Sequence, residues 1–398
     1  MISNSGSSDG GQPELHTPAQ CPRDFQIQQD CLSNTRFVDL LVPNPAQLAP
    51  GELLLQISSV ALSANNITYA VLGVRMGYWQ FFPIAAGESD TSGYGRLPVW
   101  GFADVLYSAH PEIMVGERIY GYLPLSTHLK VIAGRVSARG FIDASPHRAA
   151  LPAVYQQYRR CAQDPNYAPG REALQAILLP LLFTAFLLCD EINARIPSGK
   201  STVLLTSASS KTALATAFLL QAIRPAECEL IGLTSAKHMD FVRARGCFDR
   251  VLDYRDVANL ASERSCIAVD FSGNLALMAD IHRHCRALQH SLRIGVTHWQ
   301  DAASGAVKGV LTGPKPELFF APEYAAKRVA QWGSAEFERR TGAAWAAMVQ
   351  WAQSWLKVRS DTGEAAIADV YLATLNGVSP ADAGQMLAFK MTNSQGLS

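Results

Sequence analysis

The stretch that most restricts the fold of this chain is residues 199–238, GKSTVLLTSASSKTALATAFLLQAIRPAECELIGLTSAKH. The short apolar run at 203–205 predicts a strand, and a small polar turn follows it. The near-continuous apolar segment 213–223 predicts a helix buried against a parallel sheet, and 230–233 predicts the next strand. A strand–helix–strand unit of this size is typical of dinucleotide-binding domains, where phosphates lie over the N-terminus of the helix.

The turn in this unit lacks the glycine fingerprint G-x-G-x-x-G. Small side chains can still let the backbone approach a pyrophosphate, although they lack the freedom of glycine at positive φ. We expect the turn to lie exposed in a cleft, to tolerate charge changes better than bulk, and to bind phosphate through backbone N–H groups and hydroxyls. The residues expected to take part are Ser207, Ala208, Ser209, Ser210, Lys211 and Thr212.

Two other interpretations of this turn remain open. It could be only the serine-rich N-cap of a buried helix. Lys211 and Thr212 also resemble the end of the phosphate loop G-x-x-x-x-G-K-[ST], but both glycines of that motif are missing and the turn is too short.

Polar residues directly follow the second strand, at Thr234, Ser235 and Lys237. An NAD site usually has an acidic residue there, which holds the ribose diol. Hydroxyls with a lysine suit a 2′-phosphate instead, so the sequence predicts NADP(H) as the cofactor. The alternative for Lys237 is a solvated lysine at the start of a helix.

The 398 residues, of which 48% are hydrophobic, are enough for two domains. Strand and helix patterns alternate as far as 291–297, which predicts a doubly wound parallel sheet. Short glycine-punctuated runs in 98–131 predict a small β-barrel. A helix at 341–358 and a strand pair at 367–390 are expected to return to the barrel. The predicted domains are a disordered tail at 1–30, a mostly β domain at 31–165, a nucleotide-binding domain at 166–320 and a return at 321–398.

Composition and charge exclude several classes of protein. Lysine plus arginine equals aspartate plus glutamate, 34 each, so nothing indicates a nucleic-acid or anionic-membrane partner. The eight cysteines have neither disulfide-framework nor zinc-knuckle spacing. The N-terminus lacks the apolar core of a signal peptide, and the apolar run 176–189 is short for a membrane span. We therefore expect a cytoplasmic protein.

Taken together, the chain resembles the medium-chain dehydrogenase/reductase superfamily, in a little-characterised domain-of-unknown-function branch beside the zinc-free quinone oxidoreductases. The resemblance covers roughly residues 35–390. The segments that carry it are LPVWGFADVLYSAHPEIMVGERIYGYLP, AILLPLLFTAFLLCDEI, STVLLTSASSKTALATAF, LIGLTSAKHMDFVRARGCFDRVLDY, VDFSGN, IGVTHW and ELFFAPEYAAKR. It implies an α/β fold with a Rossmann doubly wound parallel sheet inserted in a GroES-like, mostly β catalytic domain.

Zinc-dependent members of that superfamily have a Cys and a Gly-His-Glu that are absent from this chain. The matching positions are Ala64 and Gly101-Phe102-Ala103, and alanine and phenylalanine cannot ligate a metal. The resemblance therefore implies a zinc-free member, which reduces activated C=C or C=O bonds with NADPH.

A zinc-free enzyme needs another group to stabilise the developing enolate or alkoxide, and a phenol can do so. The resemblance places Tyr78 and Tyr69 beside the nicotinamide, as candidate proton donors, and Asn66 or Asn65 could orient substrate or ribose. The competing interpretation is that these tyrosines are core or rim aromatics. Further residues that the resemblance implies near the cofactor are Tyr254 on the adenosine side, Asn274, Thr297 and Phe320.

The predicted function is a zinc-independent, NADPH-dependent reductase that transfers a hydride to an enone, an enoyl thioester or a quinone-like acceptor. The expected partner is a small-molecule substrate, and a homodimer is left open. Two alternatives remain. One is an NADPH-binding accessory or sensing protein without catalysis, and the other is a carbonyl reductase of a biosynthetic pathway.

Overall fold

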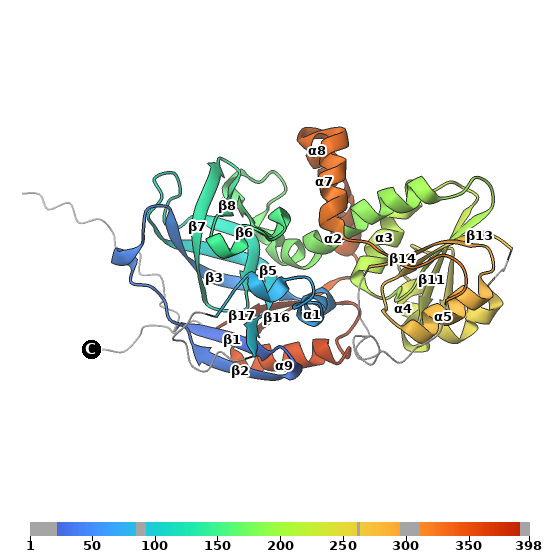
Figure 1. The fold of residues 1–398 in the computed structure, drawn as a ribbon, viewed down its shortest axis with the longest axis horizontal. Coiled ribbons are helices and arrows are strands. Elements are labelled where there is room, and N and C mark those ends of the chain that lie inside the picture. Colours follow the sequence, from blue (N-terminus) through green and yellow to red (C-terminus); the bar gives the residue numbers. More distant parts are fainter. Residues whose placement is uncertain (1–21, 85–92, 261–262, 295–310, 391–398) are drawn as a thin grey trace, which may run out of the picture.

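The computed structural model describes residues 22–84, 93–260, 263–294 and 311–390. The chain forms a β-rich domain and a Rossmann domain, and helix α2 (Glu172–Arg195) runs between them (Figure 1). The candidate cofactor residue Thr297 lies outside the described residues.

The β-rich domain is built on a closed barrel. Strand β3 pairs with β5 on one side and with β7 on the other, which closes the sheet β3-β5-β6-β9-β8-β7. The chain's last strands, β16 and β17, extend this sheet beside β3. The bounds are β3 Glu52–Leu62, β5 Pro98–Ser108, β6 Arg118–Pro124, β7 His128–Ser137, β8 Gly140–Asp143, β9 Gln157–Arg160, β16 Lys357–Thr362 and β17 Ala383–Ala388.

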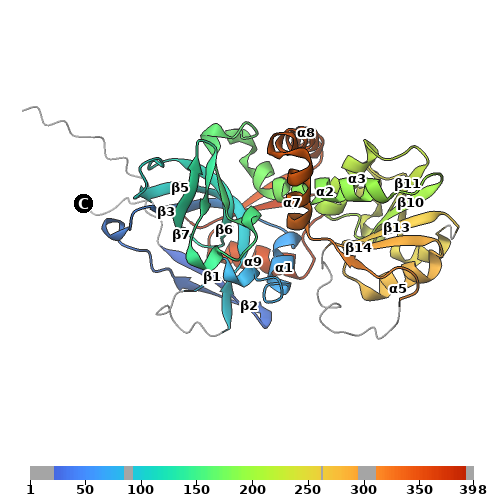
Figure 2. The same cartoon turned by 45° about the horizontal axis from the view of Figure 1, so that its top comes forward.

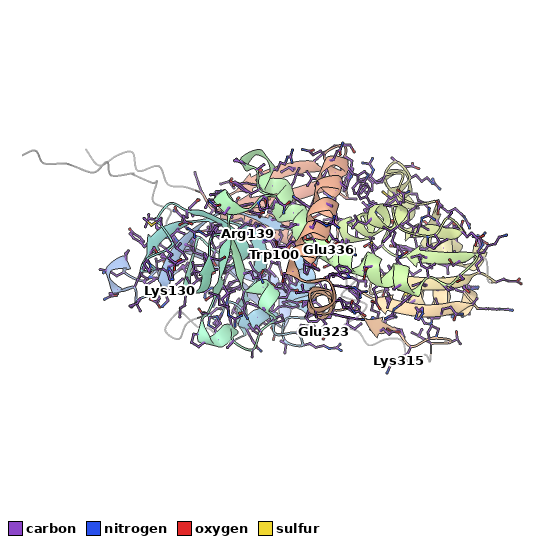
Figure 3. All side chains as sticks on the ribbon, turned by 90° about the horizontal axis from the view of Figure 1, so that it is seen from above. Trp100, Lys130, Arg139, Lys315, Glu323 and Glu336 are labelled. Atoms are coloured by element: carbon purple, nitrogen blue, oxygen red, sulfur yellow. The ribbon has the colours of Figure 1, made fainter. Side chains whose placement is uncertain are left out.

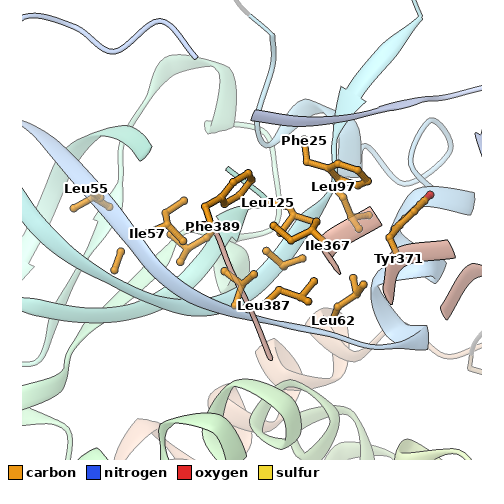
Figure 4. Packing of buried hydrophobic residues seen from close by; sticks show 14 of the residues in the cluster. Phe25, Leu55, Ile57, Leu62, Leu97, Leu125, Ile367, Tyr371, Leu387 and Phe389 are labelled. Atoms are coloured by element: carbon orange, nitrogen blue, oxygen red, sulfur yellow. The ribbon is translucent and has the colours of Figure 1, made fainter. Parts of the chain in front are cut away.

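A small antiparallel sheet and two helices complete this domain. The sheet has the order β2-β1-β4 (β1 Arg23–Gln28, β2 Cys31–Asp39, β4 Tyr94–Arg96), and the helices are α1 (Ala64–Val71) and α9 (Glu364–Leu375). Side chains from the first and last segments of the chain meet in its core (Figure 4). Phe25 of β1 packs edge-on against Tyr371 of α9, with ring centroids 5.3 Å apart, so both ends of the chain are needed for this core.

The Rossmann domain has six parallel strands in the order β12-β11-β10-β13-β14-β15. Helix α3 lies on the same face as α2, and α5 lies on the opposite face, as their separate hydrophobic clusters show. The bounds are β10 Ser201–Leu205, α3 Lys211–Gln221, β11 Cys228–Thr234, α4 Met239–Arg243, β12 Arg250–Asp253, β13 Ser265–Asp270, α5 Leu275–His284, β14 Leu288–Arg293 and β15 Glu317–Leu318. This is the doubly wound order expected of a dinucleotide-binding domain.

Helices α7 (Ala321–Trp332) and α8 (Ser334–Ala352) project from the middle of the molecule, above α2 (Figures 1 and 2). Phe337 of α8 contacts Phe183 of α2, and Trp351 stacks on Phe218 of α3 with centroids 4.7 Å apart. The chain therefore rejoins the barrel at β16, later than the residue 321 that the sequence predicts.

Helix α2 is the packing element common to both domains. Its hydrophobic cluster includes Phe102 of the barrel, Leu214 of the Rossmann domain and Trp345 of α8. By length and composition α2 is the one helix among the described residues that could cross a membrane, but most of its apolar window is buried.

The strand pair predicted at 367–390 is wrong in its first half, because 364–375 is helix α9. The sequence EAAIADVYLATL contains β-branched and aromatic residues, which suggested a strand. Its buried residues, however, are Ile367, Tyr371, Thr374 and Leu375. Residues spaced by three or four positions in this way lie on one face of a helix. Alanine, glutamate and leucine supply the helix propensity.

His128, at the start of β7, predicts a pH dependence of stability. It is buried, and burial lowers its pKa to about 4 from 6.5. Between these values the unfolded chain binds a proton that the folded chain does not, so the free energy of unfolding must fall as the pH falls through this window. The loss amounts to about 3 kcal/mol by pH 4.

Replacing His128 with Gln should flatten the acid limb of a denaturant-melt series between pH 6.5 and 4. The exposed His147, changed to Gln in the same way, is the matched control and should keep the wild-type slope. An unchanged slope in the His128 variant would show that His128 does not carry this dependence.

Candidate functional site

The candidate site lies at the edge where the parallel strands of the Rossmann domain end, here called the carboxyl edge. Thr234 ends β11 and Asp270 ends β13. Thr206 directly follows β10, and Phe320 lies two residues after the end of β15. In doubly wound sheets, ligands bind at this edge, in the crevice beyond the strand ends.

The β10–α3 turn, residues 206–210, is rigid and tight. Ser207 adopts a positive φ of 49°, a conformation that glycine usually supplies. The N–H of Ala208 donates to Leu233 O at 2.9 Å, and that of Ser210 donates to Ser207 O at 2.8 Å. The Ser210 hydroxyl accepts from Ala213 N at 3.3 Å and caps α3. The serine-rich N-cap is therefore present, and it shapes the turn.

Ala208 does not lie exposed in the cleft as the sequence suggested. Its side chain is fully buried against β11. A Cβ added to Gly232 would lie 2.9 Å from the Ala208 Cβ and 3.0 Å from the Phe248 ring. Glycine at 232 therefore makes the room that Ala208 occupies, and neither position has space for a larger side chain.

The N-terminus of α3 has donors left for a ligand. Within the described part of the chain, the N–H groups of Lys211 and Thr212 have no hydrogen-bond partner. This is the normal state of the first residues of a helix, and it suits an anion.

Lys211 faces the barrel domain. Its side chain is partly buried, and loss of hydration lowers the pKa of its ammonium to about 8, while the nearby Asp382 acts in the opposite direction. Asp382 already forms an ion pair with Lys357 at 2.8 Å. Lys211 thus presents a poorly hydrated cation at the boundary between the domains.

The loop after β13 is organised by the buried carboxylate of Asp270. One of its oxygens accepts from the Thr206 hydroxyl at 2.8 Å, from Ser272 and from the Gly273 N–H at 3.1 Å. These bonds hold the ends of β10 and β13 together. Sequence reasoning noted VDFSGN but did not assign this role to Asp270.

The end of β11 has a hydroxyl-rich corner. Thr234 is fully buried, and its hydroxyl has no partner within the described residues. The Nδ1 atom of His238 lies 3.3 Å from both Ser209 Oγ and Ser235 Oγ, so it joins the two turns. Lys237 is exposed beside them. His238 was missed by sequence reasoning, although it directly follows Lys237.

The other predicted cofactor residues reach the same edge. Tyr254 follows β12, and its hydroxyl interacts with Ser207; burial raises its pKa and this hydrogen bond opposes the rise. Asn274 caps α5 by accepting from Leu277 N at 2.9 Å. Phe320 is the N-cap of α7 and is partly buried. The Asn274 oxygen is therefore committed to its helix.

Four tyrosines of the barrel domain, Tyr69, Tyr78, Tyr122 and Tyr155, form a buried phenol cluster. The rings of Tyr69 and Tyr78 lie 4.6 Å apart, and those of Tyr122 and Tyr155 lie 4.8 Å apart. Burial raises the pKa of each phenol above its ordinary value. Each hydroxyl therefore keeps its proton at neutral pH and can act as a donor.

Within this cluster, Tyr69 and Tyr78 differ in their partners. The Tyr69 hydroxyl accepts from Asn65 Nδ2 at 2.8 Å and from Trp100 Nε1 at 3.4 Å. The Tyr78 hydroxyl lies 3.4 Å from that of Tyr155. A further hydrogen bond, with Tyr155, opposes the rise in the pKa of Tyr69 and adds to the rise in the pKa of Tyr155, as expected when Tyr155 is the donor. Tyr69 therefore keeps its own proton to give away.

A small pocket opens next to Tyr69's partners, between the barrel and α2. Its lining is Ala61, Ser63, Asn65, Asn66, Trp100, Ala176, Ile177, Pro180 and Leu181. Figure 3 shows Trp100 toward the middle of the molecule. The wall from α2 is apolar, so polar chemistry in the pocket must come from the barrel side.

The geometry of Asn66 differs from the expected orienting role. Asn66 Oδ1 accepts from Ser63 N at 2.8 Å and from Ser63 Oγ, and its Nδ2 donates to Pro98 O at 3.1 Å. These bonds cap α1 and tie it to β5. Asn65, which points to Tyr69, is better placed than Asn66 to act on a ligand.

The positions matched to zinc ligands are structural here. Ala64 begins α1, and Phe102 and Ala103 are fully buried in β5. A Cβ on Gly101 would lie 2.2 Å from Ser59 O, so this strand packs tightly on β3. In the described part of the chain, no group of three or more His, Cys, Asp or Glu side chains could hold a metal.

Comparisons with known proteins agree with this architecture. The family described as "Protein of unknown function (DUF2855)" matches residues 60–379. Comparison with curated proteins finds no match. Among solved structures, CurA from Vibrio vulnificus in complex with NADPH is similar, with a TM-score of 0.54, 14% identity, and coverage of 93% of this chain and 100% of that one.

Two further solved structures are similar to the same extent. A putative NADPH:quinone reductase from Bacillus thuringiensis has a TM-score of 0.52 and 15% identity, covering 92% of this chain and 98% of that one. JamJ enoyl reductase in its apo form has a TM-score of 0.53 and 14% identity, covering 93% and 100%. The predicted fold, a Rossmann domain inserted in a GroES-like barrel, is confirmed.

Proposed function

The chain belongs to the DUF2855 family and has the medium-chain dehydrogenase/reductase fold, and we propose that it is an NADP(H)-dependent oxidoreductase. The observation that carries the proposal is the arrangement at the domain boundary. A helix N-terminus with free N–H groups and a poorly hydrated Lys211 faces a barrel that holds protonated phenols. The similarity to CurA, which was crystallised with NADPH, supports the choice of cofactor.

The residues at the carboxyl edge fit a dinucleotide phosphate. Helix α3 offers two N–H groups and the Lys211 cation for the pyrophosphate. The Thr234 hydroxyl, which has no partner among the described residues, forms a donor-rich corner with Ser235 and Lys237 that suits a 2′-phosphate. The His238 imidazole, whose Nδ1 contacts the hydroxyls of Ser209 and Ser235, adds a further polar side chain to this corner.

The substrate pocket lies close to this cofactor edge. Lys211 faces Asp382, and two residues further on a Cβ at Gly384 would lie 2.5 Å from Ile177 Cδ1, which lines the pocket. Two residues of extended chain span roughly 7 Å. The Lys211 end of the cofactor edge and the α2 wall of the pocket therefore lie on either side of the start of β17.

NADPH, when bound, supplies the hydride, and the chain's own residues control the proton. Tyr69 holds a proton at its hydroxyl, oriented by Asn65 and Trp100, and can give it to the carbonyl oxygen or α-carbon of a reduced acceptor. The apolar residues of α2 exclude water from the opposite wall. We propose an activated C=C or C=O acceptor, such as an enone, an enoyl thioester or a quinone.

We also propose that the reaction needs no zinc. The residue types at Ala64, Phe102 and Ala103 cannot coordinate it, and the phenol cluster supplies the charge stabilisation that a metal would give. Protein treated with chelator should retain full turnover and should contain less than stoichiometric zinc by elemental analysis. Loss of turnover on chelation, restored by zinc, would contradict this.

The proposed function is tested by NADPH oxidation with a panel of enones, enals, ketones and quinones. Product analysis then separates C=C from C=O reduction. Tight NADPH binding with no turnover across the panel would favour the accessory or sensing role, and no binding of either cofactor would overturn the proposal.

Lys237 is expected to select NADPH over NADH. Lys237→Ala should weaken NADPH binding by about 1–3 kcal/mol, because a charge-assisted bond to the 2′-phosphate is lost. NADH binding should be almost unchanged, since NADH lacks that phosphate. Calorimetry with both cofactors measures the difference, and equal losses for the two would contradict the assignment.

A larger side chain in the β10–α3 turn should affect cofactor binding at one position and stability at another. Ser209 is partly exposed, so Ser209→Leu should abolish NADPH binding and leave the melting temperature near that of the wild type. Ala208→Leu should instead destabilise the fold by about 1–3 kcal/mol or more, because Ala208 is packed against Gly232. Cofactor titration and a melting curve for each variant separate these outcomes. Wild-type binding by the Ser209 variant would exclude this turn as the pyrophosphate site.

A further inference from the structure

A pair of buried cysteines lies at the opposite end of the Rossmann sheet from the cofactor edge. Cys266 is the second residue of β13, and Cys285 directly follows α5. Each is only 4% exposed. The proposed function uses neither residue.

The backbone brings Cys266 of β13 next to the turn that contains Cys285. The N–H of Cys266 donates to Ala287 O at 3.0 Å, and the N–H of Leu288 donates to Cys285 O at 3.0 Å. Both side chains line one pocket, together with Leu260, Glu229 and Arg250. Their thiols are hydrogen-bonded to each other. Two thiols that interact side chain to side chain are the arrangement from which a disulfide can form.

The pocket gives a small oxidant access to this pair. It is open to solvent and has space for a water-sized molecule. Arg250 lines the pocket, and both Arg250 and Arg264, each about two-fifths exposed, pair with the lining residue Glu229, at 3.5 and 3.2 Å.

The two thiols also differ in the direction of their pKa shifts, which suits one attacking and one resolving cysteine. The shared hydrogen bond raises the pKa of Cys266, with burial adding to the rise, and lowers the pKa of Cys285. Cys285 is therefore the better nucleophile, and Cys266 keeps its proton until it is needed.

We propose that Cys266 and Cys285 are a modification site, at which a hydroperoxide produces an intramolecular disulfide that fastens the end of α5 to the start of β13. The Cys285 thiolate attacks one peroxide oxygen and the O–O bond breaks. A sulfenic acid forms, and the released hydroxide takes up a proton to become water. The Cys266 sulfur then attacks the Cys285 sulfur and loses its proton, the S–O bond breaks, and a second water leaves. Two thiols are oxidised to a disulfide, and one hydrogen peroxide is reduced to two waters.

The test is treatment of the full chain with hydrogen peroxide, followed by a non-reducing peptide map. The expected product joins the peptides that contain Cys266 and Cys285, with a mass loss of two hydrogens. The melting temperature should rise by roughly 3 °C or more, since the bond restricts the unfolded chain, and reductant should reverse the rise. NADPH affinity should change less than about twofold, because the cofactor edge lies at the other end of the strands.

Serine variants test the order of attack. In Cys266→Ser, a sulfenic-acid reagent such as dimedone should label Cys285, roughly tenfold more than it labels Cys266 in Cys285→Ser. The matched control is Cys247→Ser, which removes another buried cysteine of the same domain and should keep the disulfide. The exposed Cys31 is expected to be oxidised independently and to appear in a separate peptide.

A map without the 266–285 link would overturn the proposal, as would a link from Cys266 to its other neighbour, Cys228. The wild-type map alone decides this point if a serine variant fails to fold. None of these readouts requires substrate turnover, so the result stands apart from the proposed reductase activity.

Discussion

Tyr69→Phe is expected to lower kcat for reduction of an activated acceptor by about 10²–10⁴-fold, the usual contribution of a positioned general acid. The change removes one hydroxyl from a ring that stays packed against Tyr78 and Tyr122. NADPH binding should be unaffected, because the change leaves the residues of the cofactor edge intact. Steady-state kinetics and a separate cofactor titration measure the two effects.

Two other tyrosines provide the comparison. Tyr120 is buried, stacks on Trp100 at 5.8 Å, and its hydroxyl has no partner within the described residues. Tyr120→Phe should therefore leave kcat within about twofold of the wild type, since the variant lacks only an unused hydroxyl. Tyr78→Phe should have a smaller effect than Tyr69→Phe, because Tyr78 faces Tyr155 instead of the pocket residues. A larger loss in the Tyr78 variant would move the proton donor to the Tyr78–Tyr155 pair.

The fold could be predicted from the sequence because its signals are local and repeated. Apolar runs alternate with helix-length segments through the Rossmann domain, and the strands β10 and β11 begin and end within about two residues of their predicted limits. Where local signals conflict, prediction failed. In α9 a strand was predicted from residue 367 on, whereas the buried Ile367 and Tyr371 lie on one face of a helix.

The site was less predictable because its contacts join segments that are far apart in the chain. The sequence proposed the 207–212 turn as a phosphate site, but it could not show that Ala208 is packed against Gly232. It indicated Tyr69 and Tyr78 but not Tyr155. The Tyr155 hydroxyl contacts that of Tyr78, although the two residues are 77 positions apart in the chain. Tyr155 lies in a short 3-10 turn with no periodicity that would mark it. The role of a residue such as Ala208 or Tyr155 depends on its tertiary contacts, and a local sequence pattern does not predict these contacts.

The contribution of Lys211 to cofactor binding is expected to be much larger from the structure than from the sequence alone. As a surface lysine it would contribute little to binding. The structure instead removes most of its hydration and places it near Asp382, whose carboxylate is already paired with Lys357. Lys211→Met should therefore weaken NADPH binding by roughly 10- to 150-fold, which corresponds to about 1.5–3 kcal/mol for a hydrogen bond to a charged group. Lys200→Met, a change of an exposed lysine just before β10, is the matched control and should bind like the wild type.

The same ammonium predicts how binding depends on pH. In the free protein the pKa of Lys211 is about 8, and a bound pyrophosphate would raise it, because an anion favours the charged form. Near pH 8 the complex therefore holds more protons than the free protein. NADPH binding should take up a proton there, and affinity should fall by up to about tenfold per pH unit above pH 8.

Calorimetry in buffers of different ionisation enthalpy measures that proton uptake directly. Lys211→Met should abolish the uptake and flatten the pH profile. If the variant instead binds NADPH like the wild type with the same uptake, Lys211 does not contact the cofactor. Its role would then be electrostatic attraction to Asp382 across the domain boundary, and the variant should show a lower melting temperature in the absence of cofactor. Because binding and melting respond oppositely in these two cases, the pair of measurements decides whether the Lys211 ammonium acts on the cofactor or on Asp382.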